Sequence, residues 1–498
     1  MSPLTGAGEQ RGAEVIDEDG DTVPLPMIPS AGDPEQPSDH RQQSYADGPG
    51  RPPFGPILKK VALGLAICLV AGAGYAGLQH IANAPADPGA PTAQQPPSAT
   101  PTTPDQAQAG VQRAVAGEAV LQKMADAIEN EDRGEFLNTI DPKATAFRAS
   151  ARTIFGNLSA LPLGTFQLRY VSDDIGALTP DRQAELGGTQ SWLAQVEVSW
   201  QLAGYDVKAA RETLPVTFVT RDGKTYAASF SERFVAGQRR PVWSLGALEL
   251  AKGKHSLVIS LGAGSEAEAE ARSYVSVADK AVESVSKVWG RSWRQKVVVY
   301  LPAKQSQMEY VLGARPNTYT QIAAVTMAEL DTPAVGAPVR IVANPKLFEE
   351  LGKQGRRIVL THETTHVAST ATASPVPLWL AEGFADYVAF NAVPVQDESA
   401  AKELFKAVRA GHVPASLPTT EAFAASAKEL PQAYESAWLA CRLIAEREGE
   451  EKLVKFYRAV HASKSSTGLA DAFQSVLGMT EAEFVAEWQK YLERLAGG

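Results

Sequence analysis

Cysteine is almost absent from the chain, which has two, Cys68 and Cys441, among its 498 residues. Cys68 lies in a run of uncharged residues that is long enough to cross a membrane, and Cys441 lies far downstream, so the two are not expected to meet. An intramolecular disulfide is therefore excluded. Cys441 stands in a segment with helical apolar spacing, and we interpret it as a small buried residue rather than a nucleophile.

A surplus of positive charge is also lacking, because 57 acidic residues outnumber 47 basic ones and the formal net charge is -10. The first fifty residues hold ten acidic residues against Arg11 and Arg41, so they carry -8 of that charge. The rest of the chain is nearly neutral, which excludes the basic footprint of a nucleic-acid-binding protein. Because the same stretch is rich in Pro, Gly and Gln, residues 1–56 are predicted to be a disordered, acidic, cytoplasmic tail.

Charge is missing altogether from residues 61–78, VALGLAICLVAGAGYAGL. At about 1.5 Å per residue these eighteen residues cross most of a ~30 Å hydrocarbon core, which predicts one transmembrane helix within residues 57–80. Lys59 and Lys60 precede the run and no basic residue follows it before Arg113. The expected topology is a single-pass cell-membrane protein with a cytoplasmic amino terminus and an extracellular remainder.

A cleaved signal peptide is the alternative interpretation, since Ala82-Asn83-Ala84 is similar to a cleavage site. A long acidic leader before a signal is unusual, so we favour the anchor. Residues 81–109 are rich in Pro, Ala and Thr, and they are predicted to form an extended linker.

Residues 110–262 are predicted to form an α+β accessory domain. Apolar residues first recur at helical spacing and then alternate from Phe166 onward, and Asp222-Gly223 indicates a hairpin turn between two of the strands. Helices followed by a run of antiparallel strands are typical of this fold class. The order of elements is similar to the cystatin or nuclear-transport-factor-2-like cone, and no catalytic constellation is present.

The pentapeptide HETTH carries the chemistry that the sequence predicts. His362 and His366 lie four residues apart, so on a helix both imidazoles project from one face at the spacing of a zinc site. Glu363 then takes the position of a general base for hydrolysis. A helix with two polar surface histidines is the alternative, but the neighbours of the motif are apolar, which indicates a buried helix.

A carboxylate for the same site follows sixteen residues after His366. Glu382 lies in WLAEGFADY, a second apolar stretch with helical spacing. Two histidines and one carboxylate hold a zinc ion and leave its fourth position open to water. The predicted cofactor is therefore Zn²⁺.

HETTH together with WLAEGFADY resembles the gluzincin metallopeptidases, in particular the peptidase MA-like group, over about residues 270–495. The resemblance implies that His362, His366 and Glu382 are the metal ligands, that Glu363 is the base, and that Asp386 orients the first histidine. A solvated acidic face is the alternative for Asp386. Many relatives carry Asn where this chain has Ala381, a departure that leaves zinc binding intact.

The resemblance has two further implications. One of the strands at Ile322–Val325 and Val339–Val342 would form the edge of the cleft and pair with an extended peptide substrate. Tyr434 would stabilise the oxyanion of the reaction, with core packing as its alternative role. His412, in a loop, is a second and weaker candidate for that role.

The sequence thus predicts a membrane-anchored chain of overall α+β class, whose residues 263–498 form a mainly helical gluzincin-like domain with a small sheet. The predicted activity is zinc-dependent hydrolysis of a peptide or protein substrate, with Glu363 and Tyr434 as catalytic residues. The alternative is an inactive zinc fold that serves as an extracellular binding or scaffolding module. Retention of Glu363 favours the enzyme, because a scaffold needs the ligands but not the base.

Overall fold

The computed structural model describes residues 104–497, except for 232–237, 321, 330–335 and 425–426, together with three short strands nearer the amino terminus. Two of these, β1 (Glu14–Ile16) and β2 (Thr22–Pro24), pair antiparallel. The third, β3 (Cys68–Val70), pairs parallel with residues Ala324–Thr326. Apart from β1 and β2, the predicted tail lies outside the described residues, as do the predicted membrane span except for β3 and the predicted linker up to residue 103.

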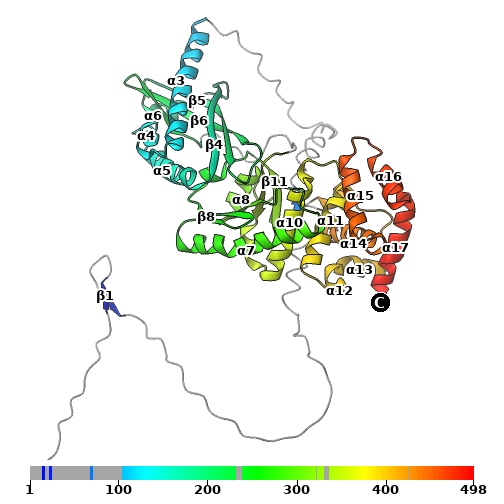
Figure 1. Cartoon of the computed structure of the whole chain (residues 1–498). Coiled ribbons are helices and arrows are strands. Elements are labelled where there is room, and N and C mark those ends of the chain that lie inside the picture. Colours follow the sequence, from blue (N-terminus) through cyan, green and yellow to red (C-terminus); the bar gives the residue numbers. More distant parts are fainter. Residues whose placement is uncertain are drawn as a thin grey trace, which may run out of the picture. The chain divides into compact units, whose positions relative to one another are not determined.

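The first large part of the described chain consists of helices followed by an antiparallel meander, in the order β4-β5-β6-β7 (Figure 1). Its elements are α3 (Pro104–Glu129), α4 (Arg133–Asn138), α5 (Thr145–Ala160), β4 (Leu163–Ser172), α6 (Pro180–Leu186), β5 (Gln190–Leu202), β6 (Ala210–Arg221) and β7 (Lys224–Ser229). The strands predicted from alternation are therefore present. Helix α3 begins at Pro104 and so includes the last residues of the predicted linker. Proline is well suited to the first turn of a helix.

The hairpin between β6 and β7 turns where the sequence predicts it. Asp222 and Gly223 both have positive φ angles, 49° and 75°, and Arg221 pairs with Lys224 across the turn. A two-residue turn with two positive φ angles matches the right-handed twist of the strands, which is why Asp-Gly favours it.

The second sheet has the order β3-β11-β12-β10-β9-β8, with β11 antiparallel to β12. Its other strands and nearby helices are β8 (Glu249–Lys252), β9 (Ser256–Leu261), α7 (Gly264–Val288), β10 (Val297–Pro302), α8 (Gln305–Leu312), β11 (Ala324–Ala328), β12 (Val339–Ala343) and α9 (Pro345–Glu350). Strand β9 pairs with β10 along six residues. The sheet thus includes β8 and β9, which the sequence had assigned to the accessory domain.

Both sheets share one apolar core. Trp200 of β5 and Trp243, in a 3-10 turn at Val242–Ser244, are buried with ring centroids 6.2 Å apart, and the same cluster includes Tyr300 of β10 and Val342 of β12. Edge-to-face aromatic pairs add about 0.5–1.5 kcal/mol beyond their burial. The accessory part therefore packs against the sheet that lies beside the predicted metal helix.

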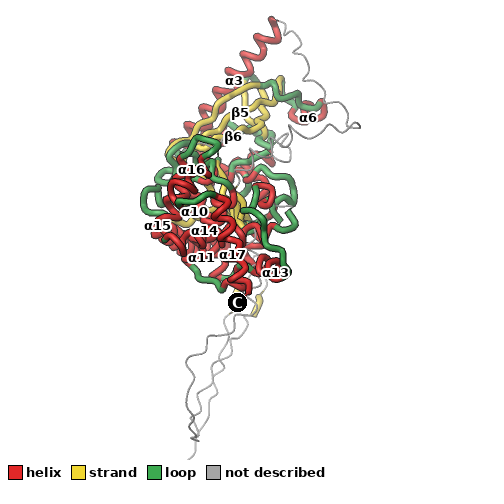
Figure 2. The backbone as a smooth tube through the Cα atoms, turned by 90° about the vertical axis from the view of Figure 1, so that its right-hand side faces the viewer, coloured by secondary structure: helices red, strands yellow, loops and turns green. Residues whose placement is uncertain are grey.

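The rest of the chain is helical, and α10, α11, α14 and α17 pack in succession (Figure 2). The helices are α10 (Lys353–Ser369), α11 (Leu378–Ala392), α12 (Asp397–Ala400), α13 (Lys402–Arg409), α14 (Leu430–Glu448), α15 (Glu450–Ala462), α16 (Gly468–Ala472) and α17 (Glu481–Gly497), with 3-10 turns at Ala371–Ala373 and Thr420–Phe423 and a π turn at Phe473–Leu477. A capping box begins α17, since Glu483 N donates to Thr480 Oγ1 and Thr480 N donates to Glu483 Oε2. Mixed helix and sheet is consistent with the α+β class.

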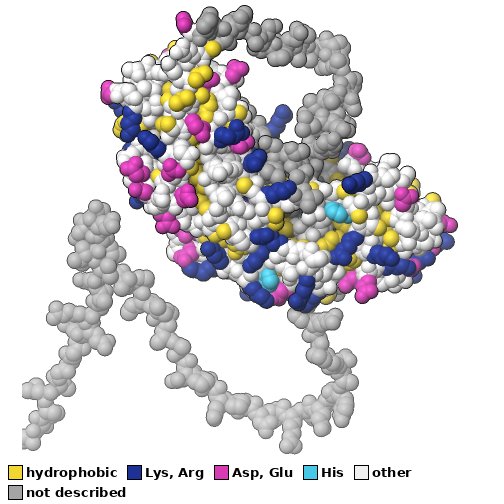
Figure 3. Space-filling view, turned by 45° about the horizontal axis from the view of Figure 1, so that its top comes forward, with side chains coloured by type: hydrophobic (Ala, Val, Ile, Leu, Met, Phe, Trp, Pro, Cys, Tyr) yellow, Lys and Arg dark blue, Asp and Glu magenta, His cyan; other side chains and the backbone are white. Residues whose placement is uncertain are grey.

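Among the described residues, no helix combines the length and the apolarity needed to cross a membrane. The predicted span at residues 57–80 falls outside them except for Cys68–Val70, which form the strand β3 rather than part of a helix, and the membrane anchor stays a prediction. On the face drawn in Figure 3, acidic and basic side chains are interspersed rather than gathered by sign.

Candidate metal centre

Helix α10 carries both histidines and is buried along the segment that contains them. Its residues Ile358, Val359 and Leu360 are at most 1% exposed, as are His362 and His366. The helix begins after Gly352 and ends at Thr370, whose positive φ of 53° breaks the helical path. The buried segment of α10 therefore holds two imidazoles in the interior, where polar groups need partners.

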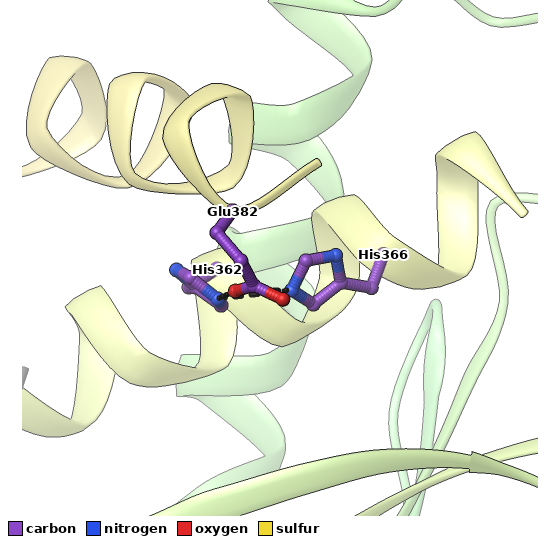
Figure 4. A group of neighbouring side chains, drawn as sticks. All are labelled: His362, His366 and Glu382. Atoms are coloured by element: carbon purple, nitrogen blue, oxygen red, sulfur yellow. Dashed lines mark hydrogen bonds and ion pairs between the residues drawn. The ribbon is translucent and has the colours of Figure 1, made fainter. Parts of the chain in front are cut away.

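Three nitrogen and oxygen atoms from two helices converge at this point (Figure 4). His362 Nε2 lies 2.9 Å from His366 Nε2 and 3.1 Å from Glu382 Oε2, and His366 Nε2 lies 3.3 Å from the same oxygen. The imidazoles come from α10 and the carboxylate from α11. The structure thus brings together the three residues that the sequence predicts as ligands.

The arrangement fits a small divalent cation. Ligands about 2.0–2.1 Å from a tetrahedral zinc ion are roughly 3.3 Å from one another, close to the separations found here. Two imidazoles and a carboxylate are the donor set of a zinc site with an open fourth position. Among the described residues, these three are also the one group of His, Cys, Asp and Glu whose donor atoms come close enough to hold an ion.

Buried atoms without partners point the same way. Glu382 Oε1 and His366 Nδ1 are buried and have no hydrogen-bond partner among the described residues. Leaving a buried polar group unpaired costs about 1–3 kcal/mol, and more when it is charged. A cation bound to the Glu382 carboxylate would offset the cost of leaving that carboxylate oxygen unpaired. Apolar side chains around the carboxylate would not.

Asp386, on α11, supports one of the two histidines. Its Oδ1 lies 2.7 Å from His362 Nδ1, so the nitrogen donates to the carboxylate and leaves Nε2 facing Glu382 and His366. Asp386 is buried, so the alternative of a solvated acidic face does not hold. Burial raises the pKa of Asp386, although the nearby His362 opposes that shift.

The charges of the site influence one another strongly. Burial by itself would lower the pKa of His362, but Asp386 and Glu382 hold that pKa well above its usual range. Burial would raise the pKa of Glu382, but His366 and His362 lower it to about 2. A proton and a metal ion therefore compete for the same imidazole, and binding of the ion releases the proton.

Glu363 lies beside the three ligands without belonging to them. Its side chain is buried, and Thr326 of β11 donates a hydrogen bond from Oγ1 to Glu363 Oε2. Its other carboxylate oxygen, Oε1, is buried without a partner among the described residues. One oxygen is thus held by the strand, while the second makes no hydrogen bond to any described residue.

Thr326 is the residue that sequence reasoning missed. It is the hydroxyl-bearing residue of a strand, AVTMA, in which every residue is buried. A polar residue in such a strand needs a partner, and that signal was present in the sequence. The partner itself lies 37 residues away and was not apparent.

Tyr434 lies in α14, where it is 3% exposed and its ring packs edge-on against Phe423 at 5.2 Å between centroids. This environment agrees with the core role left open for it, and its oxyanion role stays a prediction. His412 is exposed in the loop after α13. Cys441 is a free, fully buried thiol, as expected.

No family model matches the chain, and no curated protein matches it by sequence. Among solved structures, the chain is similar to the crystal structure of a mutant M1 zinc metallopeptidase from Deinococcus radiodurans, with 14% identity and a TM-score of 0.28. The match covers 60% of this chain and 61% of that one, which is less than two thirds of the enzyme. A similarity this low leaves fold and function to be argued from the chain's own residues.

Proposed function

We propose that this chain is a zinc-dependent metallopeptidase, anchored in the membrane by one helix and acting on a peptide or protein substrate outside the cell. The observation that carries the proposal is a buried His362-His366-Glu382 group beside a carboxylate, Glu363, that takes no part in it. A metal site needs the first three residues for binding, whereas Glu363 has no role in holding an ion.

His362, His366 and Glu382 would hold the zinc ion, which would supply a Lewis acid for a substrate carbonyl and would make water more acidic. Glu363 then acts as the base. Its free oxygen accepts the proton that the attacking water loses, and the carboxylic acid returns that proton to the amine nitrogen as the C–N bond breaks. The water oxygen forms the new C–O bond and both of its protons end on the leaving nitrogen, so the products are a carboxylate and a protonated amine and no oxidant or further reactant is needed.

The rest of the site keeps these groups in place. Asp386 fixes the tautomer of His362, and the Thr326 hydroxyl limits the rotation of the Glu363 carboxylate. Burial lowers the local dielectric, which strengthens electrostatic interactions within the site. The alternative of an inactive scaffold gains no support from these contacts, because a scaffold needs no hydrogen bond to an idle base.

The test substitutes Glu363→Gln in the purified chain and measures hydrolysis of a diverse peptide library, with zinc content determined in parallel. Zinc should stay bound at one ion per chain, whereas kcat should fall by about 10² to 10⁴, because proton transfer fails while the metal site is intact. Glu350→Gln, on the exposed side of α9, is the control and should cleave as fast as wild type.

Two outcomes would contradict the proposal. One is a wild-type chain that holds stoichiometric zinc yet cleaves nothing in the library, which favours the scaffold. The other is a Glu363→Gln variant that cleaves at the wild-type rate.

A further inference from the structure

A buried ionic cluster connects the accessory part of the chain to the sheet beside the metal centre. Arg340 of β12 binds both carboxylate oxygens of Asp206, through Nη1 at 2.7 Å and Nη2 at 2.8 Å. Asp206 belongs to the turn between β5 and β6, residues 203–209, called here the β5–β6 turn. Glu329 accepts from the Tyr300 hydroxyl at 2.9 Å and lies 2.8 Å from Arg340 Nη2.

The members of this cluster are almost completely enclosed. The side chains of Arg340, Asp206 and Glu329 are 1%, 2% and 2% exposed. Charges so deeply buried are held in a narrow set of geometries, because a change that separates them leaves an uncompensated charge in the interior. The two sides of the contact are therefore tied together more rigidly than an apolar contact of the same size requires.

The cluster meets the end of strand β11. Glu329 directly follows this strand, and its carbonyl accepts from the backbone N–H of Arg211, at the start of β6, at 3.2 Å. The preceding carbonyl, of Ala328, accepts from Arg239 Nη1 at 2.8 Å. The accessory part thus binds this end of β11 directly through two backbone carbonyls, and Arg340 of β12 links the Glu329 side chain to Asp206.

The same short strand reaches the predicted base. Thr326 lies three residues before Glu329, and its hydroxyl binds the Glu363 carboxylate and lies 3.3 Å from the carbonyl oxygen of Glu363. A path of direct contacts therefore runs from Asp206 through Arg340 and Glu329 into β11, and from Thr326 to Glu363. Any shift of β11 along or away from α10 would move the hydroxyl that orients Glu363.

We propose that the β5–β6 turn positions the active site: Asp206, through Arg340, holds β11 so that Thr326 aims Glu363 at the metal centre. Asp206 and Arg340 are then positioning residues, and the accessory domain is a required part of the catalytic unit rather than an independent module. The role given to Glu363 rests on the proposed peptidase function. The mechanical coupling of Asp206 to β11 does not.

The experiment is Asp206→Asn in the full chain. The amide replaces one of the two oxygens that face Arg340 with a donor, which loosens the cluster at similar size. Amide hydrogen exchange in Ala324–Ala328 should become about 10-fold faster, because the strand opens locally more often. Zinc should stay stoichiometric, and kcat should fall about 10-fold with a smaller change in KM, since the base is misplaced while the ligands are not.

The chain offers a matched control. Asp141, within the accessory domain, also accepts from an arginine through both carboxylate oxygens, from Arg221 Nε and Nη2 at 2.8 Å each, and it accepts from the backbone N–H of Lys143. The Arg221 and Asp141 side chains are 9% and 1% exposed. Asp141→Asn should cost comparable stability yet leave exchange in β11 and kcat at wild-type values.

The proposal would be overturned if Asp206→Asn and Asp141→Asn changed β11 hydrogen exchange and kcat equally. It would also be overturned if hydrogen exchange in β11 were unchanged in Asp206→Asn. If Asp206→Asn does not fold, Asp206→Glu takes its place, because it keeps the charge and displaces the carboxylate by one methylene. The same changes in β11 hydrogen exchange and in kcat are then expected. If wild type cleaves no peptide, the proposed function fails, while the exchange comparison still decides the coupling.

Discussion

The two histidines of the metal centre differ in their support. His362 donates through Nδ1 to Asp386 at 2.7 Å, whereas His366 Nδ1 has no partner among the described residues. A carboxylate on the far nitrogen fixes the tautomer and makes the imidazole a better ligand. The affinity of the site for zinc should therefore depend on Asp386 even though Asp386 does not touch the ion.

We predict a graded loss of zinc at the residue scale. Glu382→Ala should lose most of the metal, because a site with three protein ligands tolerates the loss of none. Asp386→Ala should weaken affinity by about 10 to 100-fold. Competition with a coloured chelator at fixed pH measures both. His412→Ala, in an exposed loop, is the control and should bind as wild type does.

Unchanged affinity in Glu382→Ala would move the third ligand elsewhere. Unchanged affinity in Asp386→Ala would mean that helix packing alone orients His362.

At the scale of elements, the position of Glu382 depends on how closely α11 approaches α14. The next residue, Gly383, has no side chain, and a Cβ built there would lie 2.2 Å from the carbonyl oxygen of Ala437 and 3.0 Å from Cys441 Sγ. The backbone of Ala437 cannot move aside for this Cβ in the way that the end of a flexible side chain could. Glycine is thus required here by the close approach of two helices and not by its own backbone conformation.

Gly383→Ala should therefore push α11 away from α14. We expect about 1–3 kcal/mol less stability against chemical unfolding, as for an overpacked core, together with weaker zinc binding, because Glu382 moves with its helix. Gly156→Ala is the control: Gly156 lies within α5, and a Cβ there meets nothing within 4 Å. Its substitution should be neutral or stabilising by up to about 1 kcal/mol. Equal effects at the two positions would show that close helix packing is not the cause.

At the scale of the whole molecule, the membrane topology is open to a direct test. The basic residues before residue 61 and the absence of Lys and Arg from residues 79–112 predict that the amino terminus stays in the cytoplasm. Protease added outside intact cells should then degrade residues 110–498, whereas lysis should be needed for cleavage within the acidic tail. Protection of residues 110–498 in intact cells would refute this orientation, and release of the chain cleaved near residue 84 would favour a signal peptide.

Short-range spacing in the sequence was enough to predict the buried helix face that carries His362 and His366. His362 and His366 share a helix face at any position where a helix forms, and an apolar neighbourhood ensures that the helix is buried. The β6–β7 turn and the capping box of α17 were predictable for the same reason. In each case the residues that interact lie within four positions of one another, so local geometry determines the outcome.

Contacts between distant parts of the chain were decided by tertiary structure alone. Asp206 and Arg340 are 134 residues apart, and Thr326 and Glu363 are 37 apart. Such pairs arise because strand order in the sheet and the packing of helices bring separate segments together, and neither is encoded in the spacing of residues along one segment. The sequence by itself thus determined which side chains are candidates for metal binding and proton transfer, whereas only the packing of β11 between the accessory part and α10 decided what holds the Glu363 carboxylate in place.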